Sequence, residues 1–147
     1  MKENNIYVRS LNEKDTLKVQ MMDEASGNCL EQWLDSYAYA YGIFKDNELI
    51  GYCSIGYADD IRDLIDNYPG KTDDSLLLSD VFVDFDFRHQ GYGTYMIKEA
   101  IKLRHKYDGY NELVFCEPMH PGLIDFYKNL GFVEIGKLCM VIPTKTK

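Results

Sequence analysis

The stretch Arg88-His89-Gln90-Gly91-Tyr92-Gly93-Thr94 separates an apolar run from an amphipathic segment. Residues 76–83, just before it, are almost continuously apolar, which is typical of a strand covered on both faces. Residues 92–107, which include its end, repeat apolar side chains such as Met96 and Ala100 at helical spacing. The sequence therefore predicts a strand, a glycine-containing turn and a helix in succession.

The same patterns predict elements on both sides of this turn. Residues 40–45 and 49–57 are rich in strand formers and flank Asp46-Asn47-Glu48, so we expect an antiparallel hairpin. The other predicted elements are a strand at 6–11, a helix after the capping residue Asn12, helical pieces at 31–37, 60–67 and 123–130, and strands at 112–116 and 133–142. This order indicates an α/β (α+β) class, a mixed sheet with helices on its faces, in a single domain over residues 1–147.

Composition and charge exclude several classes of function. The 147 residues carry a net charge of −8, which repels polyphosphate backbones, so nucleic acid is not an expected partner, whereas a cationic substrate is attracted. The aspartates between residues 59 and 74 form either a solvated face or a region that draws in an amine. No apolar run reaches the roughly 18 residues that span a bilayer, and the start of the chain lacks a signal core. We expect a cytoplasmic protein without membrane contact.

The four cysteines show no metal-ligand spacing, so no metal site is predicted. The glycine turn is different, because a turn that opens a helix points unpaired N–H groups outward and suits a phosphate. Arg88 either adds a charge-assisted contact to that phosphate or forms a surface salt bridge. The dinucleotide fingerprint fails because Met96 stands where its third glycine belongs. The P-loop fails because the Gly-Lys-Thr at residues 70–72 lacks the glycine required five positions earlier, where Ile65 stands.

This turn resembles the signature Q/R-x-x-G-x-G/A of the GCN5-related N-acetyltransferase (GNAT) family, through Arg88, Gly91 and Gly93. The resemblance extends upstream to residues 78–83 and downstream to 125–132, which is similar to the family's F-Y-x-x-x-G-F ending. It implies a central, mostly antiparallel sheet with a splayed parallel strand pair and flanking helices.

The resemblance also implies acetyl-CoA as co-substrate. Its pantetheine arm would bond to the main chain of Val81, Phe82 and Val83 as an added strand. The residues that would line its pyrophosphate are Arg88, His89, Gln90, Gly91, Tyr92, Gly93 and Thr94. Backbone amides matter more there than side chains.

Two residues are the catalytic candidates. Tyr127 matches the family tyrosine that often protonates the CoA sulfur, and packing in the core is its alternative role. Asp80 could act as general base, directly or through water, although Ser79 replaces the glutamate that some relatives carry beside it. Glu117 and His120 are the fallback bases, and structural hydrogen bonding is an equal alternative for all three.

The acceptor is open at this level. Aromatic side chains in the N-terminal half form either an acceptor wall or ordinary core and dimer contacts; they are Trp33, Tyr37, Tyr39 and Tyr41. We expect a primary amine on a small cationic molecule. The alternatives are a protein N-terminus or lysine, or a non-catalytic module that binds an acyl-CoA. A homodimer is compatible with the family, but no residue requires it.

Overall fold

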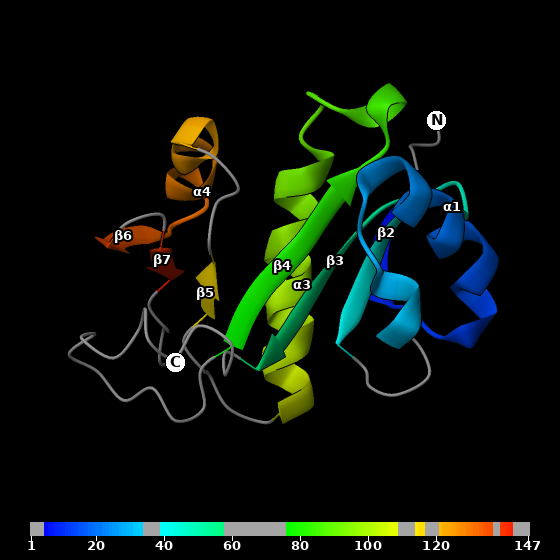
Figure 1. Ribbon diagram of the computed structural model, residues 1–147, viewed down its shortest axis with the longest axis horizontal. Coiled ribbons are helices and arrows are strands. Elements are labelled where there is room, and N and C mark those ends of the chain that lie inside the picture. The colour runs from blue at the N-terminus through cyan, green and yellow to red at the C-terminus, as the bar shows by residue number, and fades with distance from the viewer. Residues whose placement is uncertain are drawn as a thin grey trace. The chain divides into compact units, whose positions relative to one another are not determined.

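The computed structural model describes residues 5–33, 39–57, 76–108, 114–116, 121–136 and 139–142 (Figure 1). Two compact units are distinguished, Met1–Ile55 with Asp80–Arg104 and Gly56–Ser79 with His105–Lys147. The strand β4 (Leu76–Val83) gives its first half to the second unit and its second half to the first. The expectation that residues 1–147 form a single domain therefore stays a prediction. In the described ranges, no helix has the length and apolar character needed to cross a membrane.

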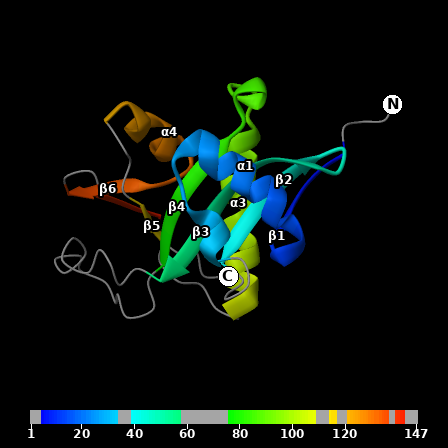
Figure 2. The same cartoon turned by 45° about the vertical axis from the view of Figure 1, so that its right-hand side comes forward.

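The first unit contains a sheet covered by two helices. The strands β1 (Ile6–Ser10), β2 (Ala40–Lys45) and β3 (Glu48–Tyr57) pair antiparallel in that order, and the second half of β4 follows β3. The helices α1 (Thr16–Ser26) and α3 (Tyr92–Asp108) lie on opposite faces of these strands (Figures 1 and 2). The strand and helix predicted around the glycine turn are therefore confirmed.

Each helix seals its face with apolar side chains. The cluster on the α1 face consists of Leu11, Val19, Met22, Leu30, Ala40, Phe44, Leu49, Tyr52 and Phe82, all buried. On α3, Met96, Ile97 and Ala100 are fully buried. Their spacing matches the helical stripe in the sequence, since residues three and four apart share one face of a helix. Removal of apolar surface from water thus holds both layers on the sheet.

The hairpin between β2 and β3 turns through two residues with left-handed backbone. Asp46 has φ of 51° and Asn47 has φ of 71°, and Lys45 pairs with Glu48 directly across the turn. Positive φ at both central positions matches the twist of antiparallel strands, and aspartate and asparagine tolerate it better than other side chains. The predicted hairpin is confirmed, with its two strands within one residue of the expected bounds.

The second unit continues from the first half of β4. Leu76–Leu78 pair in parallel with β5 (Val114–Cys116), which pairs antiparallel with β7 (Cys139–Ile142), and β7 pairs antiparallel with β6 (Val133–Gly136). The helix α4 (Ile124–Asn129) follows a 3-10 helix, η5 (Pro121–Leu123). One parallel pair among antiparallel neighbours confirms the predicted mixed-sheet α/β class.

Of two further predicted helical regions, one forms a different kind of helix and the other lies outside the described residues. The piece expected at 31–37 is a 3-10 helix, η2 (Leu30–Trp33), and residues 34–38 lie outside the described ranges. The helix expected at 60–67, with the aspartates around it, also lies outside them. A further 3-10 helix, η4 (Phe85–Phe87), precedes the glycine turn and has no signal in the sequence.

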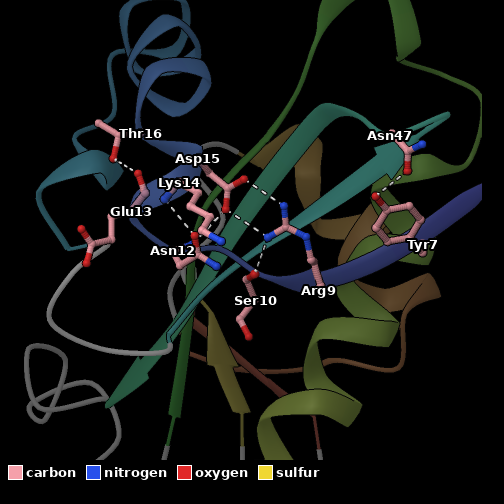
Figure 3. Close-up of polar contacts among 9 residues, drawn as sticks. All are labelled: Tyr7, Arg9, Ser10, Asn12, Glu13, Lys14, Asp15, Thr16 and Asn47. Atoms are coloured by element: carbon pink, nitrogen blue, oxygen red, sulfur yellow. Dashed lines mark hydrogen bonds and ion pairs between the residues drawn. The ribbon is translucent and has the colours of Figure 1, made fainter.

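A capping box starts the helical region after β1 (Figure 3). The Asn12 side chain accepts from Lys14 N at 2.8 Å, and Asp15 Oδ2 accepts from Asn12 N at 2.9 Å. This box closes a 3-10 turn, η1 (Glu13–Asp15), ahead of α1. Arg9 also donates to both Asp15 oxygens, at 3.0 and 2.9 Å. The predicted cap at Asn12 is confirmed, with Asp15 as its second half.

Asp15→Asn is expected to lower the free energy of unfolding by about 1 kcal/mol at neutral pH, a value reduced because Arg9 is half exposed. Burial raises the pKa of the Asp15 carboxyl, but the hydrogen bonds from Arg9 and Asn12 outweigh it and leave the pKa below its ordinary value. The stabilisation is therefore present above the unfolded pKa of about 3.9 and is lost as pH falls through the folded one. Urea unfolding of both proteins from neutral to acid pH measures it.

The matched control is Glu13→Gln, which removes an exposed neighbouring carboxylate and is expected to change stability little. If Asp15→Asn lost the same stability at neutral and at strongly acid pH, the ionised pair with Arg9 would not be the cause.

Candidate active site

Asp80 lies in β4 with an unusual backbone. Its φ of 55° is left-handed, which interrupts the extended strand at this residue. A non-glycine residue in this region costs free energy and is held by its surroundings, and such residues cluster at functional sites. Its side chain accepts from Ser54 Oγ on β3 at 3.3 Å. The structure thus places the first candidate base on a fixed, locally strained point of the strand.

The environment of Asp80 favours its protonated form. Burial raises the pKa of this carboxyl, the hydrogen bond from Ser54 lowers it, and the negative charge of Asp23 on α1 raises it further. The net pKa lies above the ordinary value. A carboxylate with a raised pKa is a stronger base than an exposed one, provided that it is ionised at the working pH.

The strands β3 and β4 approach each other closely beside this point. A Cβ atom on Gly51 would lie 2.8 Å from the carbonyl oxygen of Phe82, closer than real Cβ contacts come. Asp84 N donates to Ile50 O at 2.9 Å, which ties the end of β4 to the same strand. Val81, Phe82 and Val83 lie beyond the residues of β4 that pair with β5. Glycine at position 51 therefore fixes how near β4 can come.

The glycine turn enters α3 with left-handed residues. His89 has φ of 63° and Gly91 has φ of 88°. The first helical hydrogen bond runs from Tyr95 N to Gly91 O at 3.1 Å, so the N–H groups of Tyr92, Gly93 and Thr94 precede the helical ladder. Among the described residues, no acceptor faces these three groups. Three main-chain donors at a helix start make a favourable place for an anion.

Arg88 is held inside this turn in a way the sequence does not reveal. Its Nε donates to Val83 O at 2.6 Å, and its guanidinium lies 4.1 Å above the Phe85 ring and 5.2 Å from the Phe82 ring. Within the described ranges it forms no ion pair, so the surface salt bridge is wrong for that part of the chain. Arg88 instead links the end of β4 to the turn.

Gln90 contributes less to the turn. It is exposed, and its side chain donates to Asp86 O at 3.2 Å.

Tyr127 belongs to the second unit. It lies in α4, is 7% exposed, and meets Phe126 and Phe132 edge to face at ring-centroid distances of 5.0 and 5.6 Å. Its carbonyl accepts from Leu130 N and Phe132 N at 3.0 and 3.1 Å, which closes the helix before β6. The packing expected as its alternative role is present, and its proposed catalytic role stays a prediction.

The remaining candidates divide into two groups. Glu117, His120, Tyr37 and the side chain of Trp33 lie outside what the structure describes. Tyr41 is 2% exposed within the core, as expected from the packing alternative. Tyr39 lies under the guanidinium of the buried Arg104 at 4.4 Å. Within the described ranges, the predicted aromatic wall therefore has no support from these two tyrosines.

Tyr52 and Asp23 form a contact that the sequence does not reveal. The Tyr52 hydroxyl donates to Asp23 Oδ1 at 2.5 Å across 29 positions of the chain. No local motif links the two residues, and a polar hydroxyl within an apolar strand pattern was the only available signal.

The sequence of residues 7–132 matches the Acetyltransferase (GNAT) family. No curated protein sequence matches the chain. Solved structures of other proteins are similar to this chain over nearly its whole length. Three of them illustrate the range of sequence identity and of TM-score.

A GNAT-family acetyltransferase from Listeria monocytogenes is 19% identical, with 95% of each chain covered and a TM-score of 0.70. A ribosomal-protein-alanine N-acetyltransferase from Escherichia coli is 16% identical, with 99% of this chain and 96% of that chain covered and a TM-score of 0.69. A diaminobutyrate acetyltransferase from Paenibacillus lautus, in complex with L-2,4-diaminobutyric acid and coenzyme A, is 14% identical, with 87% and 73% covered and a TM-score of 0.62. At these identities the likeness concerns the fold.

Proposed function

Because the chain belongs to the Acetyltransferase (GNAT) family, we propose that it transfers an acetyl group from acetyl-CoA to a primary amine. The observation that carries this proposal is the start of α3, where Tyr92, Gly93 and Thr94 present main-chain donors behind a left-handed Gly91. These donors suit the pyrophosphate of the co-substrate. The similar diaminobutyrate acetyltransferase carries coenzyme A, which supports the same co-substrate here.

The proposed binding mode uses backbone more than side chains. His89 to Thr94 surround the pyrophosphate with amides, and Val81 to Val83 offer main-chain groups to the pantetheine arm. Because Arg88 Nε is engaged with Val83 O, a phosphate contact from this residue would come from its Nη atoms. The bond to Val83 would also keep the guanidinium beside the phosphate instead of in bulk water.

The proposed chemistry needs two proton transfers. Asp80 takes a proton from the attacking amine, directly or through water, so that the nitrogen can add to the thioester carbonyl. Tyr127 gives its proton to the departing thiolate, because a phenol with an ordinary pKa near 10 is protonated at neutral pH. The products are an amide and the free thiol of coenzyme A.

We favour a small cationic acceptor. The net charge of −8 attracts cations, and the similar Paenibacillus lautus enzyme has a diamine acid as its substrate. A protein N-terminus or lysine is the second candidate, and the similar ribosomal-protein-alanine acetyltransferase favours the N-terminus. A non-catalytic acyl-CoA-binding module is the third, because Ser79 stands where some relatives carry an acidic residue.

The test combines calorimetry with a thiol-release assay. Coenzyme A and acetyl-CoA are expected to bind, and thiol release is expected only when an acceptor is present. The panel is spermidine, L-2,4-diaminobutyrate, an aminoglycoside, a lysine peptide and a peptide with N-terminal alanine. Transfer to the last two alone would identify a protein acetyltransferase. Binding without transfer would favour the non-catalytic module, and no binding of either CoA form would refute the proposal.

A further inference from the structure

The Tyr52 hydroxyl is the centre of a polar network on the α1 face of the sheet. The tyrosine is fully buried in the apolar cluster, with its ring 5.9 Å from that of Phe82. Besides Asp23, its hydroxyl contacts Ser26 Oγ at 3.1 Å and Asn28 Nδ2 at 3.3 Å. Burial and the bond to Asp23 raise the pKa of Tyr52 above its ordinary value, so the hydroxyl keeps its proton and donates it to Asp23.

Asp23 also binds the main chain of the residues that follow α1. The helix ends at Gly27, whose φ is 83°, and the chain then turns into η2. Asp23 Oδ1 accepts from Leu30 N at 3.2 Å, and Oδ2 accepts from Glu31 N at 3.0 Å. The Asp23 carboxylate thus caps η2 and also accepts the hydrogen bond from the Tyr52 hydroxyl. We call residues 27–33 the tethered segment.

The same strand that holds this segment also holds Asp80. Ser54, which donates to Asp80, lies two residues after Tyr52 on β3, so both side chains point to one face about 7 Å apart. Asp80 therefore has the tethered segment on its own side of the sheet. The negative charge of Asp23 is also one of the causes that raise the pKa of the Asp80 carboxyl.

From these contacts we infer that Tyr52 and Asp23 are positioning residues for the acceptor: they hold the tethered segment on the face of the sheet that carries Asp80, where the amine must come to lose its proton. The inference rests on the proposed function, because it takes Asp80 as the base. Neither residue needs to touch the amine. Their effect reaches the amine through the segment and through the negative charge of Asp23, and leaves the main-chain groups proposed for acetyl-CoA unchanged.

Tyr52→Phe tests the tether, because it removes one hydroxyl and keeps the buried ring. The KM of the panel amine that the wild-type enzyme uses fastest is expected to rise roughly fivefold to tenfold, as for one lost charge-assisted hydrogen bond. The KM of acetyl-CoA is expected to stay the same. Hydrogen exchange of the Leu30 and Glu31 amides is expected to quicken, which shows the release of the segment directly.

Tyr7→Phe is the matched control. The Tyr7 ring stacks on Phe44 of the same apolar cluster, and its hydroxyl donates to Asn47 on the hairpin at 3.0 Å. The control also loses one tyrosine hydroxyl, but its hydrogen bond is exposed and lies away from the tethered segment, so neither KM is expected to change.

Asp23→Asn tests the electrostatic part. Among the described residues, the groups that act on the Asp80 carboxyl are Ser54 from β3, through its hydrogen bond, and Asp23 from α1, through its charge. The neighbouring Cys53 thiol stays neutral, because burial and the charge of Asp80 raise its pKa to about 12. Without the Asp23 charge, the pKa of Asp80 falls. The acid limb of kcat/KM is therefore expected to move to lower pH, a change that loss of packing alone would not produce.

Two results would overturn the inference. One is an unchanged amine KM in Tyr52→Phe, and the other is an equal rise in the KM of both substrates. Failure of the proposed function looks different, because the wild-type protein itself would then bind no coenzyme A or acetylate no amine. If Asp23→Asn does not fold, Tyr52→Phe and its exchange measurement decide alone.

Discussion

Tyr127→Phe is expected to lower kcat by about 100-fold or more while acetyl-CoA still binds. A positioned general acid contributes a factor of this order, and the phenyl ring of the variant has no proton to give to the thiolate. The substitution keeps the edge-to-face contacts with Phe126 and Phe132, so the helix and its packing are expected to persist. Steady-state kinetics with the best panel amine, together with calorimetry for acetyl-CoA, separates the lost step from lost binding.

The control for this experiment is Tyr95→Phe on α3, which removes the hydroxyl of a tyrosine that is 41% exposed. This variant is expected to leave both kcat and the affinity for acetyl-CoA unchanged. If Tyr127→Phe turned over every panel amine at the wild-type rate, Tyr127 would be a packing residue alone, and the leaving thiolate would take its proton from elsewhere.

Gly91→Ala is expected to weaken coenzyme A binding by tenfold or more. The glycine has φ of 88°, and a Cβ atom there would meet nothing within 4 Å, so any damage comes from the backbone and not from a clash. An alanine in this conformation costs roughly 1–2 kcal/mol, and the turn can relieve that cost only by rotating its peptides. Rotation would turn away the amides that precede the helical ladder. Calorimetry with coenzyme A measures the loss.

Gly27→Ala is a closely matched control for this strain. Gly27 has φ of 83° and equally open surroundings, but it ends α1. Both variants are expected to lose similar stability in thermal unfolding, and only Gly91→Ala is expected to lose affinity for coenzyme A. Gln90→Ala, whose side chain reaches only Asp86 O, is expected to bind normally. Equal affinities in all three variants would mean that the pyrophosphate lies elsewhere.

Local patterns predicted the elements that local chemistry determines. The hairpin follows from two strand-forming runs around Asp46 and Asn47, and α3 follows from a stripe of apolar residues after the glycine turn. The cap at Asn12 was equally visible, because its partner stands three residues away. The 3-10 form of η1 and η2 was not, since the same residue types serve either kind of helical turn.

The candidate site was only partly predictable, because its geometry depends on contacts between distant segments. The sequence showed Arg88 as a cation, but not that Val83 O would receive its Nε. It showed Asp80 inside a strand, but not the left-handed φ or the bond from Ser54, 26 positions earlier. The bond from Tyr52 to Asp23 has the same origin, since only the folded sheet brings β3 and α1 together.

The missing side chain at Gly51 also limits how this protein could be redesigned. A single methyl group there would collide with the Phe82 carbonyl, which belongs to the strand proposed to carry the thioester arm. A mutant library aimed at a new acceptor would naturally vary β3, because Tyr52 and Ser54 lie on it. Such a library would have to keep residue 51 constant, or it would push the co-substrate's strand aside while changing the amine's surroundings.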